Sequence, residues 1–167
     1  MCGNLGSPRK VCRCSPADVE RYQAKISGPI LDRIDIRLHV VAPSIEAIDA
    51  EDDVEQRVLE AKRVRERIAA ARVRQRQRYA HEPDVHCNAQ ATPAMRKTLL
   101  RARREALQLL RRAVRQWDLS MRAYDRTLRV ARTIADLDGA SDVDAQHVAE
   151  ALGYRVAKRP QTLRLRS

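Results

Sequence analysis

The spacing of apolar residues is the feature that most constrains how this chain can fold. From position 54 onward, apolar residues recur every three or four positions, which is the repeat of one face of an α-helix. In the first such segment they are Val54, Val58, Ala61, Val64, Ile68 and Ala71. A helix with one apolar face needs a partner to cover it. We therefore expect a mainly α fold in which several helices pack together.

Breaks in this spacing divide residues 44–155 into four helices. A polar loop at 80–92 follows the first helix, Ser120 can cap the third, and Gly139 suits the end of the third. The expected helices cover residues 52–79, 93–115, 120–139 and 144–152.

The first 43 residues follow a different pattern. Ser15 followed by Pro16 is typical of a helix start, so we expect a short helix to about residue 25, which the turn at Gly28-Pro29 ends. Apolar and polar residues then alternate in 32–42, which predicts a strand with one buried face. The predicted division is 1–43 with a cysteine-rich loop, a helix and a strand, then 44–155 with four helices, then a basic tail at 156–167 that we expect to be disordered.

The charge of the chain indicates an anionic partner. It carries 33 Lys and Arg against 22 Asp and Glu, a net charge of +11, and the excess is almost all arginine, which suits bidentate contact with phosphate. With no Phe and one Trp, base stacking is poorly supplied, so contact with DNA would be mostly to the backbone. The arginine-rich helix at 57–78 can instead be a solvated surface with local ion pairs, such as Glu66 with Arg63 and Arg67.

Other classes of function are disfavoured. No apolar run approaches twenty residues and no secretory leader is present, so we expect a soluble, cytoplasmic protein without a membrane partner. No Gly-x-x-x-x-Gly-Lys-Ser/Thr phosphate loop occurs, and no apolar run ends in an acidic pair that would hold magnesium. The chain alone is therefore expected not to hydrolyse ATP.

Arg33 lies between Asp32 and Asp35, and two interpretations are open. Either these carboxylates neutralise Arg33 locally, or Arg33 contacts a neighbouring molecule. Arg122 is in the first turn of its predicted helix, where backbone N–H groups favour an anion, although a solvated surface arginine fits the same position. Arg126, Arg129 and Arg132 read as surface or ion-pair residues, with Arg132 spaced to reach Asp136.

Four segments carry a resemblance to a known family. They are Ser27-Gly-Pro-Ile-Leu-Asp-Arg-Ile-Asp35, the stretch from Leu119 to Leu137 that includes Val130-Ala-Arg-Thr-Ile-Ala-Asp-Leu, Cys12-Arg-Cys14-Ser-Pro, and His147-Val-Ala-Glu-Ala-Leu-Gly-Tyr-Arg155. Together they resemble the C-terminal portion of the magnesium-chelatase-like AAA+ ATPases of the ComM/YifB type. In that family a run Asn-Pro-Cys-Pro-Cys-Gly stands where this chain reads Met1-Cys2-Gly3, so we expect the chain to be part of a longer protein.

The resemblance implies a fold and roles for two arginines. It implies the end of an AAA+ α/β core with one helix and one strand, followed by a four-helix lid. Arg33 would be the arginine finger, acting in trans on a neighbour's ATP, and Arg122 would be the sensor-2 residue. The full protein would be a homo-oligomeric, hexameric ring that uses ATP and Mg²⁺ to work on DNA in recombination or natural transformation. Two alternatives stay open: a stand-alone basic helical module that binds nucleic acid, and a chelatase subunit for metal insertion into porphyrin.

Cys2, Cys12 and Cys14 are candidate metal ligands. In a cytosolic protein, clustered thiols favour zinc over a disulfide. The Cys-x-Cys spacing is tighter than the usual Cys-x-x-Cys, so the signal is moderate. The family has one more cysteine, at the position of Met1, which leaves three ligands here. Cys87 or His86 could complete the site if the loop at 80–92 came close.

Overall fold

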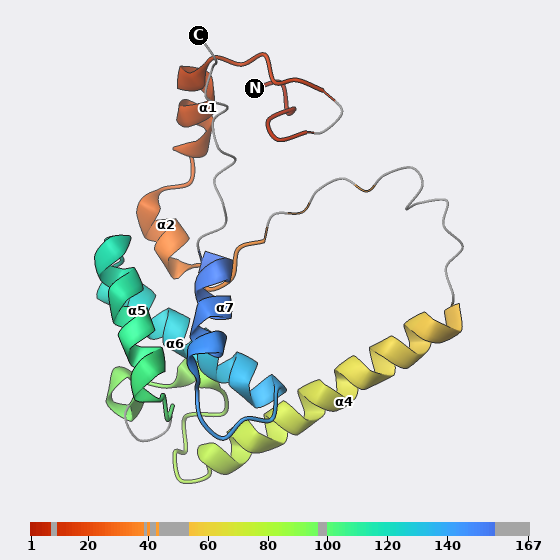
Figure 1. The fold of residues 1–167 in the computed structure, drawn as a ribbon, viewed down its shortest axis with the longest axis vertical. Helices are drawn as coiled ribbons and strands as arrows, with labels where there is room; N and C mark the ends of the chain where they lie inside the picture. Colours follow the sequence, from red (N-terminus) through yellow and green to blue (C-terminus); the bar gives the residue numbers. More distant parts are fainter. Residues whose placement is uncertain (8–9, 39, 41–42, 44–53, 97–99, 156–167) are drawn as a thin grey trace.

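The computed structural model describes residues 1–7, 10–38, 40, 43, 54–96 and 100–155. These residues form helices joined by loops, which confirms the predicted mainly α fold (Figure 1). In chain order the elements are α1 (Pro16–Gln23), α2 (Gly28–Arg33), α4 (Val54–Arg78), the 3₁₀ turns η1 (Asn88–Gln90) and η2 (Pro93–Arg96), α5 (Arg104–Gln116), α6 (Met121–Leu137) and α7 (Ala145–Arg155).

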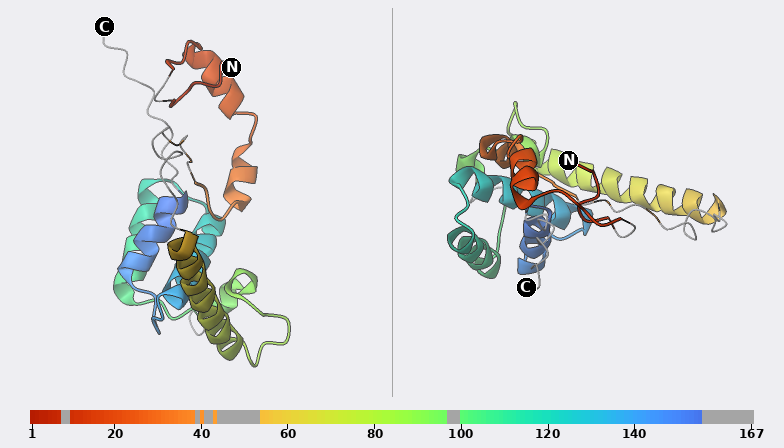
Figure 2. Two further views of the ribbon diagram at one scale, coloured as in Figure 1. Left: turned by 90° about the vertical axis from the view of Figure 1, so that its right-hand side faces the viewer. Right: turned by 90° about the horizontal axis from the view of Figure 1, so that it is seen from above.

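Helix α6 is the centre of the fold. It packs against α7, α4, α5, η1 and α2, and α5 also packs against α7 (Figures 1 and 2). Fully buried residues such as Leu110 of α5, Leu128 of α6 and Val148 of α7 meet in one core. The helical spacing predicted these faces correctly, because each of these residues lies on the apolar side of its helix.

Helix α4 packs along only part of its length. Its buried residues, Ala71 and Gln75, are in the C-terminal half, which contacts α6. Toward the N-terminus the helix extends away from the other helices, and Val58 and Val64 there are 63% and 48% exposed (Figure 1). The apolar stripe of α4 is therefore longer than the surface that covers it.

The predicted ends of α1 and α6 are confirmed. The Ser15 hydroxyl accepts a hydrogen bond from the Asp18 amide, and the Ser120 hydroxyl accepts one from the Ala123 amide at 3.1 Å. After the last turn of α6, Gly139 has φ +76°, the left-handed conformation that suits glycine after a helix.

The predicted strand at 32–42 is not formed in the residues that the structure describes within that range. Gly28-Pro29, expected to be a turn, instead begins α2, since proline fits the first turn of a helix. Beyond α2 the chain is extended without a neighbouring strand, and Leu38 and Val40 are 70% and 85% exposed. A strand needs ladder partners for its backbone groups, and among the described residues no strand pairs with this segment.

The helix expected at 93–115 is shorter than predicted. Residues 93–96 form the 3₁₀ turn η2, Arg101 has φ +44°, and α5 begins at Arg104. The Val143 amide donates to the Arg101 carbonyl at 2.9 Å, and the Val143 carbonyl accepts from the Arg103 amide at 3.0 Å. These bonds form the bridge between Ala102 and Val143, so this part pairs with the loop before α7. The structure does not describe residues 97–99 or the predicted tail at 156–167. In the described part of the chain, no helix combines the length and the apolarity needed to cross a membrane.

Candidate functional site

The segment that follows α2 is fastened to the N-terminal end of α6. The Ser120 hydroxyl, which caps α6, donates to Asp32 Oδ2 at 2.9 Å. Arg126, further along α6, donates to Asp35 Oδ1 at 2.5 Å and to the Arg33 carbonyl at 2.8 Å. Both carboxylates that flank Arg33 are thus engaged by α6 or its cap.

Arg155 fastens the same segment from the other side. Its side chain is 3% exposed and reaches from the end of α7 to the Asp32 carbonyl at 3.2 Å and the Ile34 carbonyl at 3.5 Å. Burial lowers the pKa of Arg155, and the nearby Asp32 charge opposes that effect. The Arg37 amide donates to the Tyr154 carbonyl at 2.9 Å. We call residues 32–37, together with Ser120, Arg126 and Arg155, the arginine joint.

Arg33 is exposed in this joint. Its guanidinium donates to the Pro29 carbonyl of its own helix at 3.3 Å, and it makes no ion pair with any residue that the structure describes. The local ion pairs with Asp32 or Asp35, one of the two interpretations of the sequence, are not formed. These carboxylates pair with Arg155 and Arg126 instead.

Arg122 is also exposed, in the first turn of α6. Within the described ranges, its side chain has no hydrogen bond or ion pair. Arg122 is two residues after Ser120, and Arg33 directly follows Asp32, so the Ser120–Asp32 hydrogen bond brings the backbones that carry the two arginines together.

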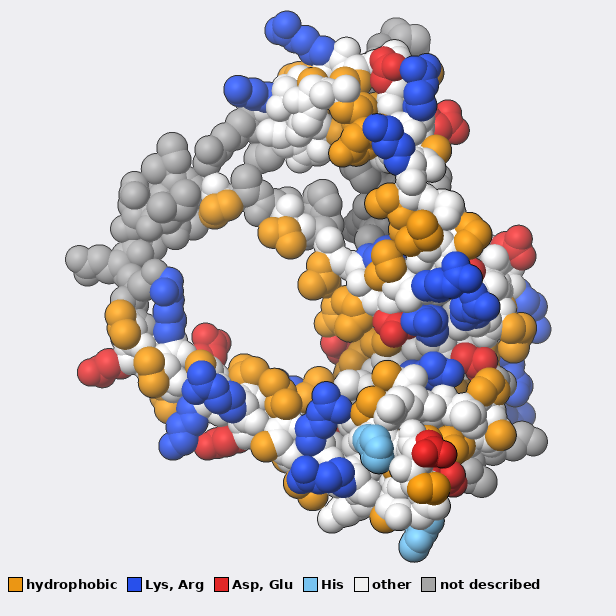
Figure 3. Space-filling view, turned by 180° about the vertical axis from the view of Figure 1, so that it is seen from behind, with side chains coloured by type: hydrophobic (Ala, Val, Ile, Leu, Met, Phe, Trp, Pro, Cys, Tyr) orange, Lys and Arg blue, Asp and Glu red, His pale blue; other side chains and the backbone are white. Residues whose placement is uncertain are grey.

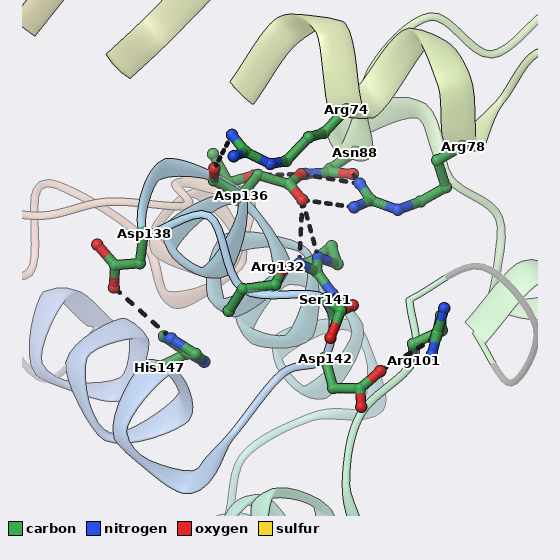
Figure 4. A network of polar contacts seen from close by, with 12 residues as sticks. Arg74, Arg78, Asn88, Arg101, Arg132, Asp136, Asp138, Ser141, Asp142 and His147 are labelled. Atoms are coloured by element: carbon green, nitrogen blue, oxygen red, sulfur yellow. Dashed lines mark hydrogen bonds and ion pairs between the residues drawn. The ribbon is translucent and has the colours of Figure 1, made fainter. Parts of the chain in front are cut away.

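A buried polar network connects α6 with the end of α4 and with the loop that follows α6 (Figure 4). Asp136 and Arg132 both have side chains that are 0% exposed, and they form the ion pair that their spacing predicts, at 3.0 Å. Arg132 also donates to the Ser141 and Ala140 carbonyls at 2.9 and 2.6 Å. Of the two roles that the sequence left open for Arg132, surface residue or ion-pair residue, the ion pair is formed, and it is buried in the core.

Arg78, at the end of α4, makes a bidentate contact with the Asp136 carboxylate. Its Nη1 donates to Asp136 Oδ2 at 2.8 Å and to Asn88 Oδ1 at 2.9 Å, and its Nη2 donates to Asp136 Oδ1. The Asn88 amide donates to Asp136 Oδ2 at 2.8 Å. Burial alone would raise the pKa of Asp136, but hydrogen bonds from Arg78 and Asn88 and the charges of Arg132 and Arg78 outweigh it and hold the pKa below its usual range.

The three N-terminal cysteines come together, as the sequence indicated. The sulfurs of Cys2, Cys12 and Cys14 all lie within 4.8 Å of one another, and Cys2 Sγ is 3.5 Å from Cys12 Sγ. Backbone hydrogen bonds from Asn4 and Arg13, followed by the Cys14 and Cys12 side chains, lower the pKa of Cys2 to about 6. The structure does not bring the two other candidate ligands, Cys87 and His86, into this group.

The exposed part of α4 is basic, and Figure 3 shows Lys and Arg side chains along it. Lys62, Arg63 and Arg65 are exposed. The ion pairs that the sequence suggested for Glu66 with Arg63 and Arg67 are not formed, and Arg67 pairs with Asp138 at 3.2 Å instead. These basic side chains are accordingly not neutralised by the acidic residues of their own helix.

An apolar groove of about 460 Å³ lies beside the joint, between residues 35–38 and helices α6 and α7. Ile36 and Leu38 line one side, and Val130, Ile134 and Tyr154 line the other. A phosphate gains little from such walls, so anions would meet the joint at its exposed arginines rather than in this groove.

Comparison with protein families places this architecture. A family model described as magnesium chelatase, subunit ChlI C-terminal, matches residues 51–155, which contain all four helices of the unit. The chain belongs to this family. A second model, magnesium chelatase, subunit ChlI, matches residues 1–48, which contain the three N-terminal cysteines and Arg33. The predicted domain division at residues 43 and 44 stays a prediction.

Curated relatives agree with this assignment. The chain is 34% identical to the competence protein ComM of Haemophilus influenzae over 148 residues, which are 88% of this chain and 27% of that protein. It is 32% identical to YifB of Escherichia coli over 160 residues, which cover 88% of this chain and 28% of YifB. An uncharacterized protein of Mycobacterium tuberculosis is 35% identical over 144 residues, 86% of this chain and 27% of that protein. The chain spans about a quarter of the length of these relatives and corresponds to the C-terminal portion of a ComM/YifB-type protein.

The sequence did not assign the joint's anchoring residues. Arg126 read as a surface or ion-pair residue, and its partner Asp35 is 91 positions away. Arg155 ended a recognised segment but had no predicted role, since its contact with residue 32 spans 123 positions. The sequence signal for these contacts was the two aspartates beside Arg33, which indicated that carboxylates here need cationic partners but did not identify those partners.

Proposed function

We propose that this chain is the C-terminal portion of a ring-forming AAA+ ATPase, in which Arg33 acts as an arginine finger and Arg122 as a sensor-2 residue. The four helices of residues 54–155 act as the lid over a nucleotide. ATP and Mg²⁺ are held by parts of the full protein outside these residues. The subunits assemble as a homo-oligomeric, hexameric ring, and Arg33 completes the site of the next subunit.

The observation that carries this proposal is the exposure of Arg33. An arginine between two aspartates ordinarily forms an ion pair with one of them, yet here both carboxylates turn toward α6 and α7. Among the described residues the Arg33 guanidinium keeps one hydrogen bond, to the Pro29 carbonyl, and forms no ion pair. It is planar and permanently charged, as a contact to a γ-phosphate requires. Three separate anchors would not be needed to expose a merely solvated arginine.

Arg122 supports the same proposal from the other side of the joint. It adds a guanidinium to the N-terminal turn of a 17-residue helix, where backbone N–H groups already favour an anion. The Ser120–Asp32 hydrogen bond and the contacts of Arg126 and Arg155 tie the finger segment to the lid. A movement of the lid on ATP binding or hydrolysis would therefore carry Arg33 with it, and this would couple neighbouring sites in the ring.

Work on DNA is the favoured output. The exposed basic side chains of α4 suit a phosphate backbone, and a relative of this chain is a competence protein. We propose recombination or natural transformation as the setting.

The finger role is tested in the full-length protein that carries this chain. Arg33→Ala should abolish ATP turnover and leave ATP binding intact, because the finger acts on the transition state. Arg33→Ala subunits mixed with subunits that lack the phosphate-loop lysine should regain part of the activity, since some interfaces then combine an intact loop with an intact Arg33. Arg129→Ala, which removes an exposed contact of α6 to the Ala89 carbonyl, is the matched control and should keep most of the activity.

Failure of the mixture to recover activity would refute a role in trans, and full activity of Arg33→Ala would refute the finger itself. The stand-alone alternative is tested separately with the 167-residue chain. If that chain binds DNA with an affinity that falls steeply with salt, and Arg33→Ala with Arg122→Ala does not alter binding or any activity of the full protein, the basic helix is the function. ATP turnover by the 167-residue chain alone would overturn the assignment of the nucleotide-binding parts to other regions.

A further inference from the structure

We propose that Cys2, Cys12 and Cys14 form a zinc site that closes the N-terminal loop in front of α1. This site is separate from the arginine joint and from the proposed ATPase function. Its ligands are Cys2, Cys12 and Cys14, whereas the main core cluster is formed by residues between Tyr79 and Leu152.

The sulfur positions fit a tetrahedral metal. Zinc–sulfur bonds of about 2.3 Å in a tetrahedron place neighbouring sulfurs about 3.8 Å apart. Cys2 Sγ and Cys12 Sγ are 3.5 Å apart, and all three sulfurs lie within 4.8 Å of one another. This spacing leaves room for one zinc ion among them, and all four cysteines of the chain are free thiols rather than disulfides.

Backbone amides donate to two of the three sulfurs. The Cys2 amide donates to Cys14 Sγ at 3.1 Å, and the Asn4 amide donates to Cys2 Sγ at 3.5 Å. Such N–H···S contacts hold the sulfurs in position beside one another. Gly3, with φ +76°, lets the chain turn sharply directly after the first ligand. When zinc binds, each thiol loses its proton to solvent and its sulfur bonds to the metal, so no oxidant or reductant is needed.

Three thiolates leave the fourth position of a tetrahedron to a ligand from outside the group, either water or another side chain of the full protein. Cys87 is not that ligand here, because its thiol donates to Gln90 Oε1 at 3.6 Å beside η1. Cys87 is therefore the matched control. It is a free cysteine of intermediate exposure, like Cys12 and Cys14, and it lies outside the group.

The test measures metal content. The chain, expressed whole and purified under reducing conditions without chelators, should carry about one zinc per molecule by mass spectrometry of metals. Cys12→Ser and Cys14→Ser should lose the bound zinc, whereas Cys87→Ser should keep it. Replacement of zinc by Co²⁺ should give the visible bands of a tetrahedral thiolate site in the unaltered chain and in Cys87→Ser only.

The circular dichroism of each variant should keep the helical signal of the unaltered chain, because the site lies outside the helical core. A chain with reduced cysteines that carries no zinc and binds no Co²⁺ overturns the proposal. So does equal loss of zinc in Cys87→Ser and Cys12→Ser, or a Cys2–Cys12 disulfide in protein taken directly from the cells. None of these readouts depends on ATP turnover, so the outcome is independent of the proposed ATPase function.

Discussion

Replacing Asp136 by asparagine removes a negative charge from the centre of the helical unit while the side chain keeps its size. Asp136 is 0% exposed and pairs with Arg132, which is also 0% exposed, and with Arg78, which is 13% exposed. No cavity is created, so the effect reports the charge and its hydrogen bonds. Two guanidinium groups lose their carboxylate, one fully buried and one near the surface.

The expected loss of stability is large. Breaking a buried ion pair by removing one partner costs about 3–5 kcal/mol, because the other charge stays buried and unpaired. Arg132 keeps its hydrogen bonds to the Ser141 and Ala140 carbonyls, and Arg78 can regain water. We therefore expect a value near the lower end, about 3 kcal/mol, against a typical unfolding free energy of about 5–15 kcal/mol.

Urea unfolding followed by circular dichroism measures this loss. With a slope of about 1–3 kcal/mol per molar urea, a loss of about 3 kcal/mol lowers the midpoint by roughly 1–3 M. Asp138→Asn is the control, since Asp138 is 43% exposed and its partner Arg67 is 60% exposed, so that this pair contributes at most about 1 kcal/mol. Asp138 Oδ2 also lies 3.6 Å from His147 Nε2, and asparagine keeps an oxygen that can accept a hydrogen bond there. If Asp136→Asn lowers the midpoint no more than Asp138→Asn does, the network is not a determinant of stability and the reasoning is wrong.

The pH, two glycines and Arg155 should each affect the helical unit in a measurable way. The lowered pKa of Asp136 means that its stabilising contribution is present above the pKa of an unfolded aspartate and is lost as the pH falls, so the gap in unfolding free energy between the unaltered chain and Asp136→Asn should shrink below about pH 4. Gly139→Ala should destabilise by about 1–2 kcal/mol because φ is positive there, whereas Gly153→Ala, in the α7 helix with open space around it, should stabilise by about 0.5–1 kcal/mol in the same assay. Arg155→Met should speed hydrogen exchange of the Arg37 amide by freeing the joint, and unchanged exchange would show that Arg155 does not hold it.

The four helices could be predicted because helical spacing and capping are local properties. Ser120 and Gly139 mark the ends of α6 through bonds to residues a few positions away. The Arg132–Asp136 pair could be predicted for the same reason, since its members are one turn apart. Its burial could not, because that depends on α4 and on the loop at 140–141 closing over it.

The strand prediction was wrong because the alternation of apolar and polar residues shows which face of a strand could be buried, but not whether a second strand lies beside it. Ile34, Ile36 and Leu38 have the period of a strand, but a strand forms only when another supplies its hydrogen bonds. In its described part, the segment makes a backbone hydrogen bond to Tyr154 and accepts hydrogen bonds from the guanidinium groups of Arg126 and Arg155. The prediction of one helix over 93–115 was wrong for a different reason. The helical spacing of apolar residues continues through Ala102, where the backbone instead pairs with Val143.

The exposure of Arg33 shows why a site of this kind is hard to read from neighbours in sequence. The sequence places two carboxylates beside Arg33, which favours a local ion pair between Arg33 and one of them. The fold instead assigns those carboxylates to Ser120, Arg126 and Arg155, which lie 88, 91 and 123 positions from their partners. Each distant contact removes a local competitor for Arg33, so the same interactions that fix the segment to the helical unit also keep its guanidinium available.

On this basis, the effect of Arg126→Gln should come from the carboxylate that it releases rather than from the charge that it removes. Asp35 would be released to pair with Arg33, and in the full-length protein ATP turnover should fall even though Arg33 is intact. Asp35→Asn in the Arg126→Gln background should then restore part of the turnover, because the released competitor is removed, and a double variant no more active than Arg126→Gln would contradict this account.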